Sequence, residues 1–299
     1  MRMHDDEVDI DLALVRALLA ERFPRWADLP VRAVPSTGTD NAMFRVGDDL
    51  AVRLPRVEWA VKGVELERRW LPRLAPHLPV AIPEPVGLGA PACGYPWPWS
   101  VYRWLPGTNP AVGALADPHA LARAVAGFVA ALRAVDTAGA PAAGRGVPLA
   151  RRDTGTREAI AELEGVIDTD AVTDAWEKAL RAPQWTGDPV WLHGDLSPGN
   201  LLLSGDDELT AVIDFGALGV GEPACDLISA WNLLPADARD TFRGALDVDD
   251  ATWARGRGWA LSIALLQLPY YRDSNPGLAA NARHVIDQVV ADHITFGCR

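Results

Sequence analysis

Two short polar loops, each placed directly after a run of apolar residues, constrain this chain more than any other part of its sequence. The first, HGDLSPGN at residues 193–200, places an aspartate two residues after a histidine and an asparagine five residues after that aspartate. The second, DFG at residues 214–216, begins fourteen residues after Asn200 and follows the apolar run AVI. Either loop alone is ordinary turn composition, because Asp, Asn, Ser, Pro and Gly all favour turns. Their joint occurrence in this order, each after a strand-like run, indicates one shared site.

The residue types in these loops suit one kind of chemistry. A carboxylate and an amide oxygen are ligands that Mg²⁺ prefers, and a second carboxylate can orient a hydroxyl group and take its proton. The pattern H-x-D-x-x-x-x-N followed by D-F-G is that of the catalytic and metal loops of protein-kinase-like phosphotransferases. We therefore predict Asp195 as the catalytic base and Asn200 and Asp214 as the metal ligands. His193 is interpreted as a residue that organises the loop rather than one that takes part in the chemistry.

The apolar patterning predicts a small α+β lobe over residues 1–104, which would bind the nucleotide. Two β-prone runs flank Gly47-Asp48-Asp49, which is the composition of a hairpin turn. The segment 78–89 is too rich in proline for a helix. The expected elements are a helix at 8–20, strands at 42–47 and 50–55, a helix at 58–75 and a strand at 99–105.

Residues 105–299 are expected to form a larger, mainly helical lobe that carries the catalytic and acceptor-binding groups. The Ala/Gly/Pro-rich segment 138–148 is predicted to be a loop, and the runs WLHGDL, NLLLSG and LTAVIDFG are predicted to contain short strands. The expected helices lie at 118–135, 156–167, 170–182, 224–234, 236–245, 250–268 and 277–296. The predicted fold class is thus α+β and bilobal, with an antiparallel sheet in the small lobe and a cleft between the lobes as the ligand site.

The chain resembles the aminoglycoside phosphotransferase family and its choline-kinase and macrolide-kinase relatives. The resemblance is carried by residues 193–203 and 211–227, and more loosely by 36–56. It implies a protein-kinase-like fold that holds ATP or GTP between its lobes, with Mg²⁺. It also implies that Asp226, in the run EPACDL, supports the catalytic loop.

The predicted phosphate-binding elements depart from the protein-kinase pattern. The loop that should cradle the phosphates, beginning Ser36-Thr37-Gly38, has one glycine in place of G-x-G-x-x-G. The chain has only two lysines, and the strand position where kinases of this fold offer a lysine holds Arg53. A guanidinium can pair bidentately with phosphate oxygens, so Arg53 is predicted to bind the nucleotide. The alternative is a solvated strand arginine.

Further nucleotide-site residues follow from the family pattern. The partner expected for Arg53 is a helix glutamate, and we choose Glu67 over Glu65 from its spacing to Trp70. Arg103, Trp104 and Leu105 lie where the inter-lobe hinge should present backbone groups to the nucleotide base. Trp104 can alternatively be a core residue.

The charge balance bears on partners. The formal net charge is −12, which argues against nucleic acid, because phosphate binding needs clustered positive charge. Residues 187–299 carry 16 acidic and 7 basic residues, so their surface favours a cationic small-molecule acceptor. Candidate acceptor contacts are Glu222, Trp231, Asp273 and the acids of 153–177, for which solvated or core roles are the alternative reading.

Other sequence signals exclude several classes of protein. No uninterrupted apolar run approaches ~18 residues, so no membrane-spanning helix is expected. Cys93, Cys225 and Cys298 are far apart and match no disulfide or zinc pattern, which together with the acidic N-terminus favours a cytoplasmic protein. No sequence signal bears on the oligomeric state.

Three functions compete at this stage. The leading hypothesis is an O-phosphotransferase that uses ATP or GTP and Mg²⁺ to modify a hydroxyl of a small molecule, first of all an aminoglycoside-type antibiotic. One alternative is a macrolide or metabolite kinase. The other is a nucleotide-binding pseudokinase, which is favoured by Arg53 in place of lysine and by the atypical loop. The complete set of Asp195, Asn200 and Asp214 favours an enzyme, and the lack of an A-P-E element after Asp214 disfavours a protein kinase.

Overall fold

The N-terminal part of the chain folds around a five-stranded antiparallel sheet of order β1-β2-β3-β5-β4. The computed structural model describes residues 7–35 and 40–297. The predicted hairpin is confirmed, with Met43 opposite Arg53, and Gly47 takes the positive φ of 58° that its turn requires. The strands are β1 (Val31–Ala33), β2 (Asn41–Val46), β3 (Leu50–Pro55), β4 (Pro85–Gly89) and β5 (Trp99–Arg103).

One face of this sheet is covered by the first helix, α1 (Leu12–Arg22). Asp11 caps this helix by accepting a hydrogen bond from the Leu14 amide at 2.8 Å, which explains why it begins four residues later than the predicted 8. Alternate residues of β2 point into the small-lobe core, as the period of a half-buried strand demands. That core contains Val15, Leu18, Leu19, Ala42, Phe44, Val46, Val52, Leu54, Trp99 and Val101.

The helix α2 (Val61–Leu74) joins the small lobe to the rest of the molecule. Its buried residues Trp70, Leu71 and Leu74 belong to the hydrophobic core of the larger lobe. The ring of Trp70 packs against that of Trp191 at a centroid distance of 4.8 Å. A helix that the sequence assigns to the small lobe is therefore bound by packing to both.

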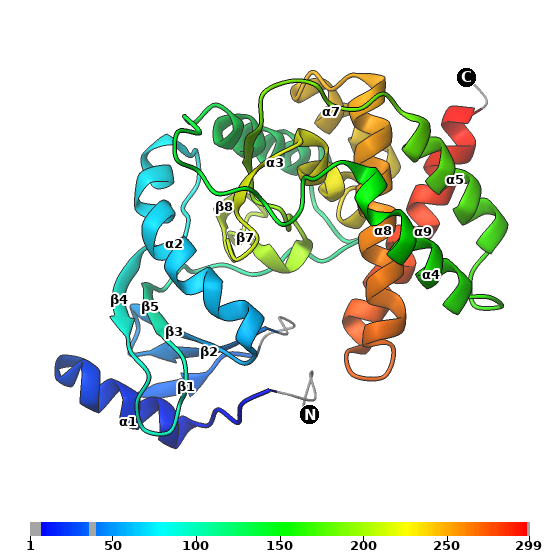
Figure 1. Cartoon of the computed structure of the whole chain (residues 1–299). Coiled ribbons are helices and arrows are strands. Elements are labelled where there is room, and N and C mark those ends of the chain that lie inside the picture. Colours follow the sequence, from blue (N-terminus) through cyan, green and yellow to red (C-terminus); the bar gives the residue numbers. More distant parts are fainter. Residues whose placement is uncertain (1–6, 36–39, 298–299) are drawn as a thin grey trace.

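The larger lobe is mainly helical and lies above and to the right of the small lobe in Figure 1. Two short antiparallel strand pairs, β6–β9 and β7–β8, lie on its side nearest the small lobe. They are β6 (Val190–Leu192), β7 (Leu201–Leu203), β8 (Leu209–Val212) and β9 (Gly219–Gly221). The α-helices are α3 (Pro118–Arg133), α4 (Asp153–Glu162), α5 (Thr169–Arg181), α6 (Ser229–Asn232), α7 (Ala236–Ala245), α8 (Asp250–Tyr271) and α9 (Pro276–Gly297).

The predicted α+β, bilobal fold is confirmed, with one correction. The expected helix at 224–234 is instead a 3₁₀ helix, η6 (Pro223–Ile228), followed by the single turn of α6. All six residues of η6 are buried, and the carboxylate of Asp226 accepts hydrogen bonds from the catalytic loop more than thirty residues earlier in the chain. The boundary at residues 104 and 105 stays a prediction. Over the described residues, none of the helices has the length and apolar character to cross a membrane.

Candidate active site

The loop that follows β6 is held by a buried carboxylate. Asp226 is fully buried, and its two carboxylate oxygens accept hydrogen bonds from the amides of His193 and Gly194, both at 2.8 Å. Burial raises the pKa of Asp226, although His193, these amides and Arg133 favour its charged form. Gly194 has a φ of 80°, and a Cβ there would lie 2.8 Å from the carbonyl oxygen of Ala217. Only glycine fits this turn.

His193 connects the two polar loops. Its side chain is fully buried, and its Nδ1 accepts a hydrogen bond from the amide of Asp195 at 3.2 Å. Nε2 therefore carries the proton and donates to the carbonyl oxygen of Ile213 at 3.0 Å. The ring also packs edge-on against Phe215 at 4.6 Å. With both ring nitrogens engaged by backbone groups, this geometry agrees with a loop-organising role.

Asp195 and Asn200 contact each other at the mouth of the loop. The amide nitrogen of Asn200 donates to the Asp195 backbone oxygen at 2.8 Å and to Asp195 Oδ2 at 3.1 Å. The backbone of Asn200 also accepts a hydrogen bond from the amide of Ile213 at 2.9 Å, directly before Asp214. The predicted base and the two predicted metal ligands are thus brought together by backbone bonds between the two loops.

Arg53 lies at the centre of an ion-pair network that spans three elements. Its Nη1 contacts Glu67 Oε1 of α2 at 2.5 Å, and its Nη2 contacts Asp214 Oδ1 at 2.6 Å. The side chain of Asn41, with its amide oxygen toward Arg53, accepts from Nη2 at 2.9 Å. Glu67, and not Glu65, is therefore the helix partner; the side chain of Glu65 pairs with Arg68 on the surface.

Glu67 also anchors the second polar loop. It is fully buried, accepts a hydrogen bond from the amide of Phe215 at 2.9 Å, and receives another from the hydroxyl of Tyr102. Burial disfavours the charged form of Arg53, but Asp214 and Glu67 outweigh it and raise the pKa of Arg53 well above its ordinary value. Arg53 therefore remains a cation in the cleft.

Asp214 is held in an uncommon backbone conformation, with a φ of 64°. Although 43% of its side-chain surface is accessible, the cleft partly buries the carboxylate. Burial raises the pKa of Asp214, but Arg53 first and His193 next outweigh it, so the pKa lies below its usual value. The carboxylate is therefore ionised at neutral pH and open to a further ligand.

The residues present fit a magnesium ion. The nitrogen of the Asn200 side chain makes both of its bonds to Asp195, which leaves its amide oxygen for a cation. Together with the accessible carboxylate of Asp214, this is a set of hard oxygen donors of the kind Mg²⁺ binds, the rest of its coordination being supplied by water and phosphate. Among residues 7–35 and 40–297 there is no larger cluster of His, Cys, Asp and Glu that could hold a metal.

Arg145 is a site residue that the sequence did not indicate. It lies in the predicted loop 138–148, and its Nη1 contacts Asp195 Oδ1 at 2.5 Å and the carbonyl oxygen of Gly194 at 2.9 Å. Burial disfavours its charge, yet Asp195 outweighs this and raises the pKa of Arg145. The loop is rich in Ala, Gly and Pro and has no motif, so only its position in space could reveal this arginine.

Two of the residues predicted to contact the nucleotide base already use their backbone amides in hydrogen bonds within the protein. The amide of Arg103 donates to the carbonyl of Glu84 at 3.0 Å, and the amide of Trp104 donates to that of Asp49 at 2.8 Å. Trp104 is half-buried and lies under the guanidinium of Arg45 at 4.8 Å, so it is not a core residue. Leu105 follows it in the connection to the larger lobe. The predicted phosphate-loop residues Ser36, Thr37 and Gly38 lie outside the described residues.

Two of the candidate acceptor contacts are buried, which agrees with the core role that the sequence left open as their alternative. Trp231 is fully buried and packs against Trp253 at 4.7 Å, so it belongs to the helical core. Glu222 is buried and forms an ion pair with Arg255. Asp273 is 92% exposed at the end of α8, while acids of the stretch 153–177 pair within the lobe, as Asp174 does with His293.

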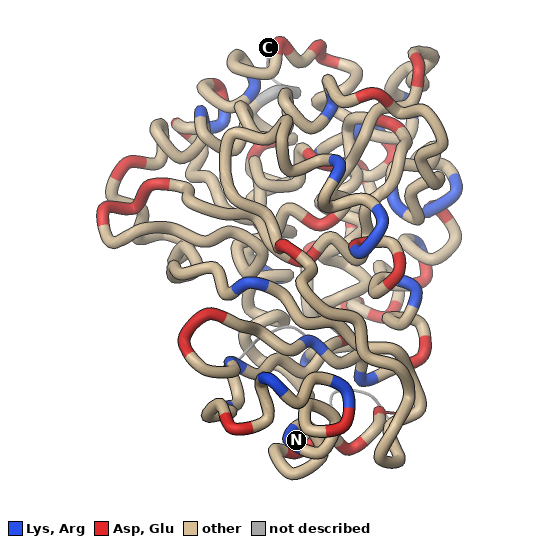
Figure 2. Tube along the Cα trace, turned by 90° about the vertical axis from the view of Figure 1, so that its left-hand side faces the viewer, with Lys and Arg blue, Asp and Glu red and all other residues tan. Residues whose placement is uncertain are grey.

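Acidic residues are found along both lobes and are not confined to the larger one. In the view of Figure 2, acidic and basic segments are interspersed over both lobes.

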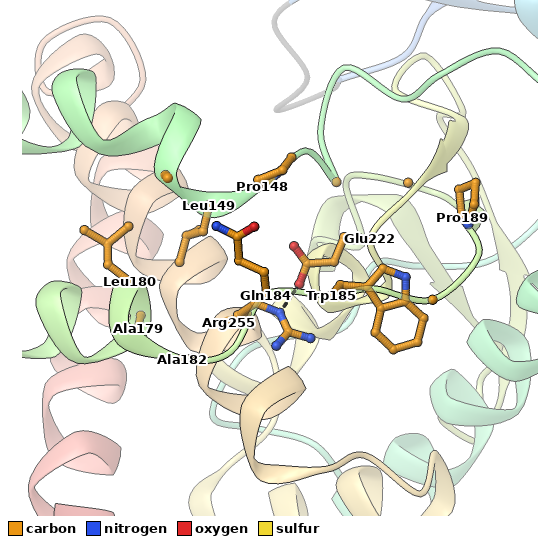
Figure 3. A pocket seen from close by; sticks show the side chains of 14 residues that line it. Pro148, Leu149, Ala179, Leu180, Ala182, Gln184, Trp185, Pro189, Glu222 and Arg255 are labelled. Carbon is orange, nitrogen blue, oxygen red and sulfur yellow. Dashed lines mark hydrogen bonds and ion pairs between the residues drawn. The ribbon is translucent and has the colours of Figure 1, made fainter.

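A cavity of about 190 Å³ lies beside the loop that carries Arg145. Figure 3 shows the Glu222–Arg255 ion pair in its wall, with Trp185 and Pro148 at its sides. Gly146 also lines it, but none of Asp195, Asn200 and Asp214 does. We place the chemistry at the two loops and not in this cavity, because the ionisable groups that could act on a substrate converge at the loops.

A small lobe with an antiparallel sheet, a helical lobe, and an Asp–Asn loop bonded to a D-F-G loop between them together define a protein-kinase-like phosphotransferase. Comparison with known proteins identifies the family. Residues 32–259 match the sequence model of the phosphotransferase enzyme family, abbreviated APH. The chain therefore belongs to this family, as the sequence predicted, and is a kinase-type enzyme.

Solved structures share the fold over nearly the whole chain. The GDP complex of aminoglycoside 2'-phosphotransferase-IIIa has a TM-score of 0.76 at 20% identity and covers 95% of this chain and 100% of its own. The GDP and kanamycin complex of APH(2")-IIia has a TM-score of 0.75 at 21% identity, with coverages of 93% and 98%. The apoenzyme of macrolide 2'-phosphotransferase MphH from Brachybacterium faecium has a TM-score of 0.62 at 24% identity, with coverages of 93% and 97%. No curated protein sequence matches the chain significantly.

Proposed function

We propose that this enzyme transfers the terminal phosphoryl group of ATP or GTP to a hydroxyl group of a small molecule, with Mg²⁺, and that the acceptor is an aminoglycoside-type antibiotic. The observation that carries the proposal is the complete set of Asp195, Asn200 and Asp214 bonded across two loops. The nucleotide is supported by GDP in similar structures, and the acceptor class by kanamycin in one of them. A cationic acceptor also suits the acidic balance of residues 187–299.

The roles of the described residues follow from their positions, and that of Ser36, Thr37 and Gly38 follows from the sequence pattern alone. Asp195 takes the proton of the acceptor hydroxyl while that oxygen bonds to phosphorus, and the bond from phosphorus to the bridging oxygen breaks to release the nucleoside diphosphate. Asn200 and Asp214 would hold Mg²⁺, which would neutralise phosphate charge. Arg53, held by Glu67, would pair with phosphate oxygens; Ser36, Thr37 and Gly38 would cradle the phosphates, and Arg103, Trp104 and Leu105 would border the base.

The test is a screen for nucleoside diphosphate release with ATP and with GTP, over aminoglycosides, macrolides and amino alcohols. Each product is checked by mass for one added phosphoryl group. We expect transfer to an aminoglycoside. Transfer to macrolides alone would show that the acceptor is a macrolide and not an aminoglycoside. Nucleotide binding without transfer to any acceptor would indicate a pseudokinase.

The base is tested with Asp195→Asn, which keeps the size of the side chain and removes its basicity. We expect kcat to fall by about 10³-fold, while the melting temperature falls only slightly through loss of the ion pair with Arg145. The exposed Asp188→Asn serves as the matched control. Activity of Asp195→Asn close to that of the unchanged enzyme would exclude Asp195 as the base.

A further inference from the structure

The catalytic loop carries no cation of its own. Residues 193–203 contain neither lysine nor arginine. Arg53 is already engaged by Glu67, Asp214 and Asn41. A phosphoryl group in transfer carries negative charge on its outer oxygens, and cations placed against them stabilise the transition state. A further cation beside Asp195 would therefore stabilise the transition state of phosphoryl transfer.

Arg145 is placed there by a rigid backbone. Its loop runs along β9: the amide of Ala143 donates to the carbonyl of Val220 at 2.9 Å, and the amide of Glu222 donates to that of Gly146 at 2.7 Å. These bonds lie on both sides of Arg145 in the sequence. They hold its guanidinium on the catalytic loop, with 30% of the side chain accessible.

The charge of the same guanidinium also interacts with a carboxylate of the small lobe. Asp40, the residue before β2 and next to the predicted phosphate loop, lies close enough to add to the raised pKa of Arg145. Arg145 therefore lies against the predicted catalytic carboxylate, 2.5 Å from Asp195 Oδ1, with part of its side chain open to the space beside it. In a phosphotransferase this is the space that the terminal phosphoryl group must enter to reach the acceptor hydroxyl.

We propose that Arg145 is a further catalytic residue, whose guanidinium pairs with the terminal phosphoryl oxygens of the bound nucleoside triphosphate. In the ligand-free protein it pairs with Asp195 instead. It forms no covalent bond and keeps its proton throughout, while Asp195 takes the proton of the acceptor. This inference rests on the proposed function.

The test measures binding as well as turnover. Titration calorimetry compares a nucleoside diphosphate with a non-hydrolysable triphosphate analogue, in the adenine and the guanine series, for the full chain and its Arg145→Gln and Arg145→Lys variants. In Arg145→Gln we expect the preference for the triphosphate to fall about ten-fold and kcat about 100-fold, with diphosphate affinity nearly unchanged. Arg145→Lys should have a triphosphate preference and a kcat between those of the unsubstituted enzyme and Arg145→Gln, because a lysine keeps the charge but loses the planar fork of donors. Exposed Arg151→Gln is the matched control.

The outcomes separate this inference from the proposed function. An unchanged triphosphate preference in Arg145→Gln would overturn the role of Arg145, whatever acceptor is found. If the unchanged protein binds nucleotides but phosphorylates no acceptor, the proposed function fails while the binding ratio still decides the role of Arg145. Absence of all nucleotide binding by the unchanged protein would overturn both. Equal losses of diphosphate and triphosphate affinity in both variants, with lowered melting temperatures, would show a structural role only and also overturn it.

Discussion

At the scale of single residues, the most distinctive feature of this cleft is that two arginines form ion pairs with its carboxylates. Arg53 stands where kinases of this fold usually offer a lysine, and it pairs with Glu67 and Asp214 at the same time. A guanidinium has donors in a fixed fork that can serve two carboxylates together, which an ammonium on a flexible stem does less well. Arg145 pairs with Asp195 in a similar way. The predicted base Asp195 and the predicted metal ligand Asp214 thus each have an arginine partner before any substrate binds.

Replacement of Arg53 should act on the nucleotide. We expect Arg53→Ala to raise the nucleotide KM by about 10- to 100-fold, because a charge-assisted phosphate contact and the tether of Asp214 are both lost. Arg53→Lys should keep most of the affinity. Steady-state kinetics with varied nucleotide measure this, with the exposed Arg32→Ala as control. An unchanged nucleotide KM in Arg53→Ala would show that Arg53 has a structural role and does not bind the nucleotide.

The ion pair of Asp214 should be visible in the pH dependence of stability. The folded pKa of Asp214 lies below the value of about 3.9 in an unfolded chain. Its contribution is therefore complete above about pH 4 and is lost as the pH falls through the folded pKa. We expect the free energy of unfolding to fall less steeply on acidification in Asp214→Asn. Denaturant titrations from about pH 6 to pH 3 test this, and parallel curves would contradict it.

At the scale of elements, the site is assembled by the ends of short strands and by one 3₁₀ helix. β6 leads into the catalytic loop, β8 leads into the D-F-G loop, and η6 carries the carboxylate that holds the first of them. Each of these elements is too short to be stable alone. Hydrogen bonds between loops, such as that from Ile213 to Asn200, replace regular ladders. Such an arrangement positions side chains without needing long elements.

The support from η6 can be tested with Asp226→Asn. An asparagine keeps the shape but turns an NH₂ group toward one of the two amides, so one buried N–H loses its acceptor. Removal of a buried charge offsets part of this loss in the free energy of unfolding, because burial disfavours the charged form and raises the pKa of Asp226. We expect a net loss of about 1 kcal/mol in stability, seen as a melting temperature lower by about 2–4 °C, and a larger loss in kcat.

The control for this prediction is Asp206→Asn, which changes an exposed carboxylate in the turn between β7 and β8. It should leave both melting temperature and kcat unchanged. Full activity and stability of Asp226→Asn would show that the catalytic loop keeps its shape without this carboxylate.

At the scale of the whole molecule, α2 couples the two lobes. Glu67 reaches the D-F-G loop, while Trp70 packs on Trp191 in the larger lobe. Glu67, which pairs with Arg53, and Trp70, which makes the contact between the lobes, are thus within one turn of the same helix. Any movement of the small lobe has to move both.

The lobe contact should carry a large part of the stability. Trp70 is 5% exposed, and Trp70→Ala should cost about 3–5 kcal/mol of the free energy of unfolding. Trp59→Ala, at a 47% exposed side chain, should cost less than about 1 kcal/mol. Urea unfolding followed by circular dichroism measures both. Similar small losses in the two variants would show that the lobes are held together elsewhere.

The sequence by itself determined the parts that depend on local pattern. Two β-prone runs joined by Gly47-Asp48-Asp49 predicted the hairpin, because strand propensity and turn composition are local properties of a sequence. The spacing within HGDLSPGN and DFG predicted which side chains would meet, because a loop between strands of set length fixes how far its residues can separate. The choice of Glu67 over Glu65 rested on the resemblance of its spacing to Trp70 to the family pattern, and the ion pairs of the two residues agree with it.

Only the tertiary structure decided the contacts that join segments distant in sequence. Arg145 lies 50 positions before Asp195, in a loop without a motif, and the two meet because backbone bonds to β9 bring that loop to the site. Burial of Trp231 and Glu222, read from sequence as acceptor contacts, depends likewise on which helices pack over them. Local pattern predicts elements and their faces, because these depend on near neighbours in the chain. Which faces come together is decided by the packing of the whole core, and that sum of many weak long-range contacts leaves no short signature in the sequence.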